Sequence, residues 1–128
     1  MKNGQERGAV AVEMALLLPV LVLLLLGIME FGRAYNAQVT LTNAAREGVR
    51  VMAITNVRSD ARTAAKNAAT DLGLADSNFT FTTSPTTSPA TCAAGRQVTM
   101  TISYTLSTLT GIAGPFTMTG KGVMQCGG

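Results

Sequence analysis

Apolar residues form one uninterrupted run near the start of the chain and are spaced periodically after it. The 21 residues from position 9 to position 29 contain a single charged side chain, that of Glu13. A helix of this length, rising about 1.5 Å per residue, spans roughly 30 Å, which is the thickness of the hydrocarbon core of a bilayer. We therefore predict a membrane-spanning helix over residues 9–29.

The helical pattern continues beyond this run. When residues are placed at about 100° each, seven of them fall within an arc of about 120°: Phe31, Ala34, Tyr35, Leu41, Ala45, Val49 and Met52. Gln38 is a polar exception on this arc. We expect one continuous helix from about Ala9 to about Ile54, whose second half is amphipathic and packs its apolar stripe on the rest of the protein.

The remainder of the chain predicts a second, short helix and three strands. The helix begins at Ser59 and Asp60, which are good N-cap residues, and ends at Gly73. Apolar and polar residues then alternate with a period of two over 79–82, over 98–106 and from 116 to about 124. Such alternation is typical of an antiparallel sheet with one solvated face, so the fold class is α+β with about three strands.

Composition and charge exclude several function classes. The net charge is +3 without a dense basic patch, so we expect no nucleic-acid partner. The chain has no histidine, which is the commonest general base and metal ligand. It also has no paired carboxylates and no nucleophile beside a base. We therefore expect no enzyme, no catalytic residue, no metal and no cofactor.

The two cysteines flank the main strand pattern. Cys92 lies just before the long strand and Cys126 just after the last one. Outside the cytoplasm they can pair and close a loop of about 35 residues. The alternative, a catalytic or metal-binding pair, lacks a histidine or a third thiol. We predict a structural disulfide.

The N-terminal flank sets the orientation of the apolar run. Lys2 and Arg7 are expected to stay in the cytoplasm, which places the C-terminal part outside. The run is then a cleaved signal peptide, an uncleaved signal anchor, or a helix retained after removal of a short leader. The first lacks a small-x-small cleavage site. Glu13 favours the third, since a cut after Gly8 creates an ammonium group on Ala9 one helical turn from the carboxylate.

Several short blocks point to a family. They are Arg7 with Gly8, Glu13, Leu18 with Pro19, EFGR at 30–33 and NAAREG at 43–48. Together they resemble the N-terminal region of the TadE/TadF-like minor pilins, or pseudopilins, of the tight-adherence (Tad or Flp) pilus system. The resemblance implies a pilin-like fold and cleavage between Gly8 and Ala9 by a prepilin peptidase. It makes Glu13 the fifth residue of the mature chain. Because a buried, unpaired carboxylate is costly, we expect Glu13 to pair with the ammonium group of Ala9 during assembly.

The resemblance also implies an organisation and a set of partners. Residues 1–8 are a leader, 9–29 a transmembrane or filament-core helix, and 30–128 an extracytoplasmic head. The expected partners are the prepilin peptidase, a companion minor pilin, the major pilin, the inner-membrane assembly platform and membrane lipid. We expect a single-pass protein of the inner membrane, or a pilus component at the cell surface, that serves adherence.

Two alternatives remain at this point. One is an uncleaved, membrane-anchored extracytoplasmic binding module, and the other is a pseudopilin of a secretion machine. The Ser/Thr/Pro loop at 84–89 is either a variable adhesive tip or a connector.

Overall fold

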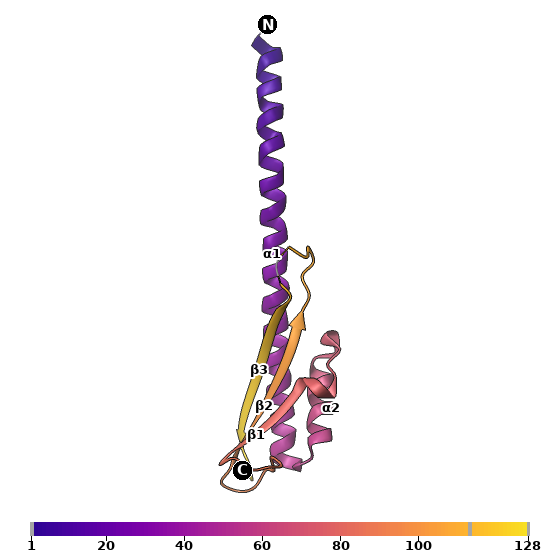
Figure 1. Ribbon diagram of the computed structural model, residues 1–128, viewed down its shortest axis with the longest axis vertical. Helices are drawn as coiled ribbons and strands as arrows, with labels where there is room; N and C mark the ends of the chain where they lie inside the picture. Colours follow the sequence, from indigo (N-terminus) through magenta and orange to yellow (C-terminus); the bar gives the residue numbers. More distant parts are fainter. Residues whose placement is uncertain (1, 113, 128) are drawn as a thin grey trace. The chain divides into compact units, whose positions relative to one another are not determined.

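The computed structural model describes residues 2–112 and 114–127, so Met1 of the predicted leader lies outside it. In chain order the structure contains α1 (Lys2–Thr55), α2 (Arg58–Ala68), the 3-10 turns η1 (Thr70–Leu72) and η2 (Asp76–Asn78), β1 (Phe79–Ser84), β2 (Gln97–Leu106) and β3 (Phe116–Gln125) (Figure 1). Contacts divide the chain into a first unit, Met1–Arg33, and a second unit, Ala34–Gly128. The α+β class predicted from the sequence is confirmed.

The long helix begins earlier than predicted. We expected a start near Ala9, but α1 begins at Lys2, because Gln5, Glu6 and Arg7 are good helix formers that extend the helix towards the N-terminus. The predicted end near Ile54 is confirmed, since α1 ends at Thr55. Asn56 follows in the left-handed conformation, with φ of 53°, and its amide donates to the Met52 carbonyl at 2.9 Å. This conformation ends many helices.

The second unit contains an antiparallel sheet in the order β1-β2-β3. Phe79 pairs with Ile102 at one end of β1, and Leu106 pairs with Phe116 where β2 and β3 are joined. Val98, Met100 and Ile102 alternate along β2 and are completely buried. All three predicted strands are therefore confirmed. The predicted alternation is seen in β1 and β2, whereas Phe116 at the start of β3 is exposed rather than packed on the helix.

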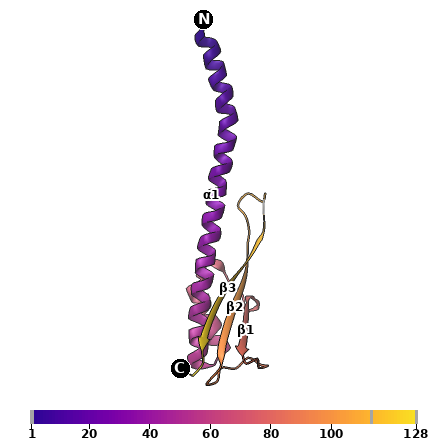
Figure 2. The ribbon, with the colours of Figure 1, turned by 90° about the vertical axis from the view of Figure 1, so that its left-hand side faces the viewer.

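The helices of the second unit cover one face of this sheet. Figure 2 shows the three strands on one side and the second half of α1 with α2 on the other. The guanidinium carbon of Arg62 on α2 lies 5.7 Å from the ring centre of Phe81 on β1. Lys66 on α2 forms a salt bridge with Asp76, and this hydrogen bond and charge hold the pKa of the Asp76 carboxyl below its ordinary value.

Two glycines of β3 let the sheet approach α1 closely. A Cβ atom on Gly120 would lie 2.6 Å from the Leu41 carbonyl oxygen, and one on Gly122 would lie 2.5 Å from the Ala45 carbonyl oxygen. Both distances are too short for any side chain. The strand therefore lies directly on the helix backbone, and glycine is required at both positions.

The buried face of α1 differs from the predicted stripe. Leu41, Ala45, Val49 and Met52 are buried as expected, but Tyr35 is 66% exposed. Phe31 is exposed too, and it belongs to the first unit. The face consists largely of small residues, because a close helix–sheet approach has no room for large ones. Its buried residues are Ala37, Leu41, Ala44, Ala45, Gly48, Val49 and Met52.

The second helix also starts earlier than predicted, because its N-cap lies two positions before Ser59. The N-cap residue of α2 is Val57, which makes no side-chain cap, and the helix begins at Arg58. Ala61 and Ala65 are buried as the alanine stripe predicted. Gly73, with φ of 58°, ends η1 rather than α2.

Candidate membrane helix and processing site

The apolar run predicted to span the membrane is exposed at every residue except Leu26, which is half-buried. It forms part of the one helix, among the described residues, that is long and apolar enough to cross a bilayer, and none of its most apolar 18-residue window is buried. A helix at the core of a soluble protein would be covered by its own fold. The exposure instead fits a single-pass membrane anchor, whose apolar side chains face lipid or other helices.

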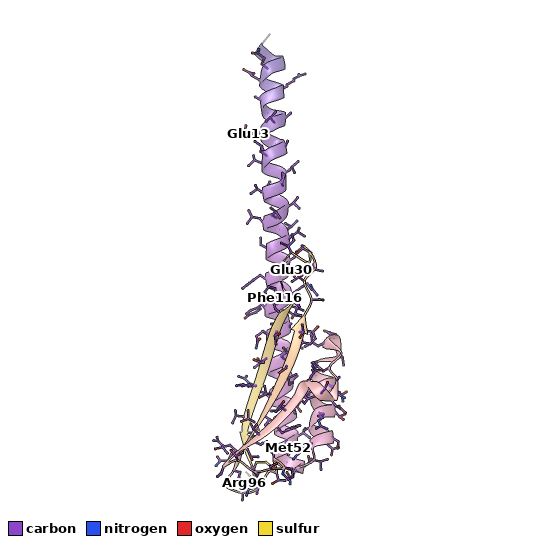
Figure 3. All side chains as sticks on the ribbon, in the orientation of Figure 1. Glu13, Glu30, Met52, Arg96 and Phe116 are labelled. Carbon is purple, nitrogen blue, oxygen red and sulfur yellow. A yellow bond between two sulfur atoms is a disulfide. The ribbon has the colours of Figure 1, made fainter. Side chains whose placement is uncertain are left out.

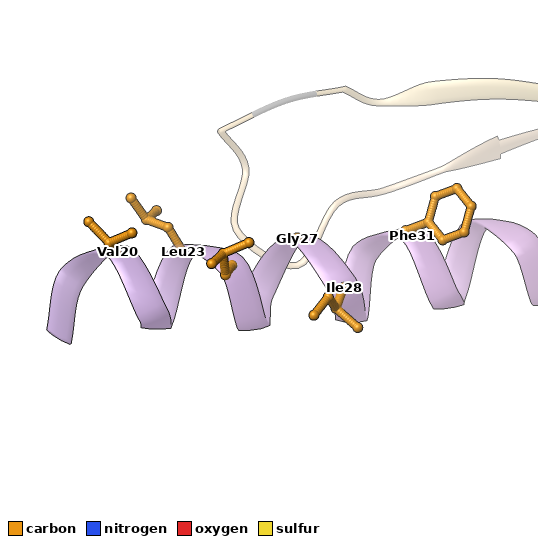
Figure 4. A pocket seen from close by; sticks show the side chains of 6 residues that line it. Val20, Leu23, Gly27, Ile28 and Phe31 are labelled. Carbon is orange, nitrogen blue, oxygen red and sulfur yellow. The ribbon is translucent and has the colours of Figure 1, made fainter. Parts of the chain in front are cut away.

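A shallow apolar groove runs along the second half of this segment (Figure 4). Its lining residues recur every three or four positions: Val20, Leu23, Leu24, Gly27, Ile28 and Phe31. Gly27 leaves the helix backbone uncovered in the middle of the groove, since nothing lies within 4 Å of where its Cβ would be. The groove carries no ionisable side chain, so it offers packing surface rather than chemistry.

The predicted cleavage position lies on the exposed surface of α1. Gly8 and Ala9 are both helical and exposed, and nothing lies within 4 Å of where a Gly8 Cβ would be. A second shallow hollow is lined by Glu6 and Arg7 on one side of this bond and by Val10 and Ala11 on the other. The bond is therefore sterically open, although it is part of a regular helix.

Glu13 lies one turn beyond Ala9, and its side chain projects outward from α1 (Figure 3). It is exposed, and within the described part of the chain it has no salt bridge. The next carboxylate along α1, Glu30, pairs with Arg33 at 3.6 Å. Glu13 therefore lacks a charged partner within the described part of the chain. If helices pack around it and exclude water, a neighbouring molecule must supply that partner.

The NAAREG block at 43–48 has a packing role in this fold. Ala44, Ala45 and Gly48 are buried, whereas Asn43 and the charged residues at 46 and 47 are exposed. A Cβ on Gly48 would lie 2.5 Å from the Met100 side chain and 3.1 Å from the Ala61 carbonyl oxygen. The block thus brings α1, α2 and β2 together at one point.

The cysteines are joined at the C-terminal end of β3. Cys92 and Cys126 form a disulfide with a Cα–Cα distance of 5.3 Å. Two residues that sequence reasoning missed hold the loop containing Cys92: the Asn56 side-chain oxygen accepts from the Cys92 amide at 2.7 Å, and Arg58 donates to the Ala90 carbonyl at 3.0 Å. The signal was Asn56 itself, because asparagine often occupies the left-handed position that ends a helix.

The described residues also lack the cluster of ligands that a metal site needs. Among residues 2–112 and 114–127, no three histidine, cysteine or acidic side chains gather in a way that could hold a metal ion. What the geometry offers is an exposed apolar helix, an accessible peptide bond near its start, and a small disulfide-closed head.

These features fit one class of protein, in which a single-pass membrane anchor is followed by a small α+β head. Residues 8–50 match the model of a family described as TadE-like protein, which confirms the resemblance seen in the sequence over about a third of the chain. The TadE-like region supports a protein associated with the Tad pilus. No curated protein and no solved structure matches the chain.

Proposed function

We propose that this protein is a structural minor pilin that is processed after Gly8 and assembled into, or required for the assembly of, a Tad pilus used in surface adherence. The observation that carries this proposal is the TadE-like match, which begins at Gly8 and continues through the apolar run. Its first residue coincides with the predicted end of the leader. Residues 9–29 then act as the membrane and filament-core helix, and residues 30–128 as the head.

Processing by a prepilin peptidase fits the local structure around Gly8. A peptidase must open the helix to reach the bond between Gly8 and Ala9. Glycine is less favourable than alanine inside a helix by about 1 kcal/mol, and no side chain packs over Gly8. Local opening at this position is therefore inexpensive, and the rest of α1 stays intact.

Glu13 supplies the axial pairing in this proposal. After cleavage, the new amino group of Ala9 and the Glu13 carboxylate lie about 6 Å apart along the helix axis. When helices pack together and water leaves, an unpaired carboxylate costs several kcal/mol, and the ammonium group of a neighbouring subunit offsets much of this cost. The partners are then the major pilin, a companion minor pilin and the inner-membrane assembly platform.

The orientation follows from the flanking charges. Lys2 and Arg7 keep the N-terminus in the cytoplasm, and the head is exported. The disulfide between Cys92 and Cys126 supports export, because such bonds persist in oxidising compartments. We propose no catalytic activity for the head, whose role is to contact neighbouring subunits or the surface to which the cell adheres.

The intact mass of the protein from the membrane fraction tests the proposal. The wild type is expected to begin at Ala9, whereas Gly8→Val is expected to keep residues 1–8. Gly27→Val is the matched control, since Gly27 is also helical with nothing packed over it, and it is expected to mature normally. A wild type that retains the leader would favour the uncleaved anchor, and maturation of Gly8→Val at Ala9 would refute the assigned leader.

A further inference from the structure

The connection between β2 and β3 carries large apolar side chains on its outside. Leu109 is 54% exposed, Ile112 is 77% exposed, and Phe116 at the start of β3 is 46% exposed. No charged side chain occurs in residues 97–120, a range that covers β2, the connecting loop and the first half of β3. Because these three apolar side chains gather in one uncharged loop, the loop is a candidate surface for an apolar contact.

The loop uses its own hydroxyl groups to satisfy its backbone. The Thr108 hydroxyl accepts from the Gly111 amide at 3.0 Å, and the Thr110 hydroxyl accepts from the Ile112 amide at 3.4 Å. Gly111 and Gly114 adopt positive φ of 70° and 91°, which lets the chain turn tightly on either side of Ile112. Two backbone amides of the loop are thus satisfied locally, while the Ile112 side chain is exposed.

The contacts of β3 with α1 show at which end of the head this loop lies. The Gln38 side chain donates to the Thr119 carbonyl at 2.8 Å, and Gly120 and Gly122 lie against Leu41 and Ala45 in turn. β3 therefore runs in the same direction as this part of α1. Its first residue, Phe116, lies towards the end of the head where the chain enters at Ala34 (Figure 3).

This end of the head is close in sequence to the predicted membrane-spanning run, which ends at Met29, five positions before Ala34. The exposed side chain of Tyr35 belongs to the same end. Tyrosine and phenylalanine prefer the boundary between lipid tails and headgroups, and serine and threonine hydroxyls can hydrogen-bond with the headgroups. The loop has both kinds of group, from Ser107 to Phe116.

We propose that the β2–β3 loop is a second membrane contact, in which Leu109, Ile112 and Phe116 enter the interfacial layer of the leaflet on the head side. The partner is lipid, because the loop belongs to the end of the head that continues directly into the membrane helix. The absence of charge between 97 and 120 means that anionic lipids are not required. The proposal rests on the membrane anchoring in the proposed function, but not on cleavage or pilus assembly.

Tryptophan fluorescence provides the test, since the chain contains no tryptophan. Single substitutions Ile112→Trp, Leu24→Trp and Thr86→Trp are made in the full chain and reconstituted into phosphatidylcholine vesicles. Leu24→Trp reports the spanning helix. Thr86→Trp is the control for the opposite end of the head, because it follows Ser84, which pairs with Gln97 at the far end of the sheet from Leu106. Disulfide formation in each variant checks that the head has folded.

Lipids brominated close to the glycerol are expected to quench Ile112→Trp strongly and Thr86→Trp hardly at all. Lipids brominated at the chain ends are expected to quench Leu24→Trp more than Ile112→Trp. If Leu24→Trp is quenched but Ile112→Trp resembles Thr86→Trp, the loop contact is refuted while the anchor stands. If neither is quenched, both the contact and the anchor fail. An indole at 112 that is shielded only when other pilus proteins are added would refute the lipid contact in favour of a protein partner.

Discussion

Gln38 on α1 donates a hydrogen bond from its side-chain nitrogen to the backbone carbonyl of Thr119 on β3, over 2.8 Å and 81 positions of sequence. β3 has a neighbouring strand on one side only, because the sheet order is β1-β2-β3. An edge strand leaves backbone groups unpaired, and these groups invite pairing with another chain. The one polar residue of the predicted apolar stripe thus satisfies part of an open sheet edge.

Replacing Gln38 by methionine is expected to destabilise the head by about 0.5–1.5 kcal/mol, because it removes this hydrogen bond while keeping the length of the side chain. Thermal unfolding of the full chain in detergent micelles, followed by circular dichroism, is the measurement. Gln97→Met is the control, since Gln97 is exposed at the end of β2. Equal midpoints for the two variants would contradict a stabilising role for the Gln38 contact.

Gly122→Ala is expected to cost about 1–3 kcal/mol or to prevent the head from folding, because its Cβ would overlap the Ala45 carbonyl oxygen. Gly32→Ala is the matched control, since the helix is open at this position and alanine is the better helix former. Urea unfolding of both variants in micelles measures the difference. A Gly122→Ala protein as stable as the wild type would mean that β3 does not lie directly on α1.

The disulfide is expected to be complete in exported protein and to matter for stability. Closing a loop with a sequence separation of 34 stabilises by about 3–4 kcal/mol in the chain-entropy model. Free-thiol labelling of the denatured membrane fraction should therefore find no thiol without reductant and two per chain with it. The double substitution Cys92→Ser with Cys126→Ser should lower the unfolding midpoint. Two reactive thiols under non-reducing conditions would contradict the pairing in the cell.

Glu13→Ala is expected to spare membrane insertion and abolish pilus incorporation. Removing the carboxylate makes the apolar run easier to insert, but it leaves the ammonium group of a neighbour unpaired in the packed filament. Membrane fractionation and a pilus-assembly assay separate the two steps. Glu47→Ala is the control, because Glu47 forms an exposed pair with Arg50, which contributes little. Normal assembly by Glu13→Ala would remove the pairing from the proposed function.

The strands and the second half of α1 could be predicted because one chemical pattern determines them. The period-two alternation from Val98 to Leu106 gave the central strand nearly to the residue, since its buried side chains are large and aliphatic. The end of α1 was similarly clear. In these segments the residues that the sequence pattern places on the apolar face are the ones that the fold buries.

Other features depended on tertiary distances that no local pattern contains. Tyr35 fits the apolar arc by angle, but it is exposed because the head packs on smaller residues such as Ala37 and Ala44. Glycine is unfavourable inside a strand, and only the nearby backbone of Leu41 and Ala45 explains its presence at positions 120 and 122. The residues of the candidate site likewise include some that the sequence predicts and some that it does not. Glu13 was identified from the cost of a charge in an apolar run. The hydrogen bonds of Asn56 and Arg58 to the loop containing Cys92 could not be predicted, because they join segments that are far apart in the sequence.

The pairing of β3 with α1 also sets an order of events in biosynthesis. The helix surface around Leu41 and Ala45 emerges early, but the strand that covers it emerges about 80 residues later. The helix face therefore has no covering strand until β3 has been synthesised, and Cys126 follows β3 in the chain. The head can therefore close only after β3 has been made, so a chain that ends before residue 122 has the long helix but lacks the strand that covers it.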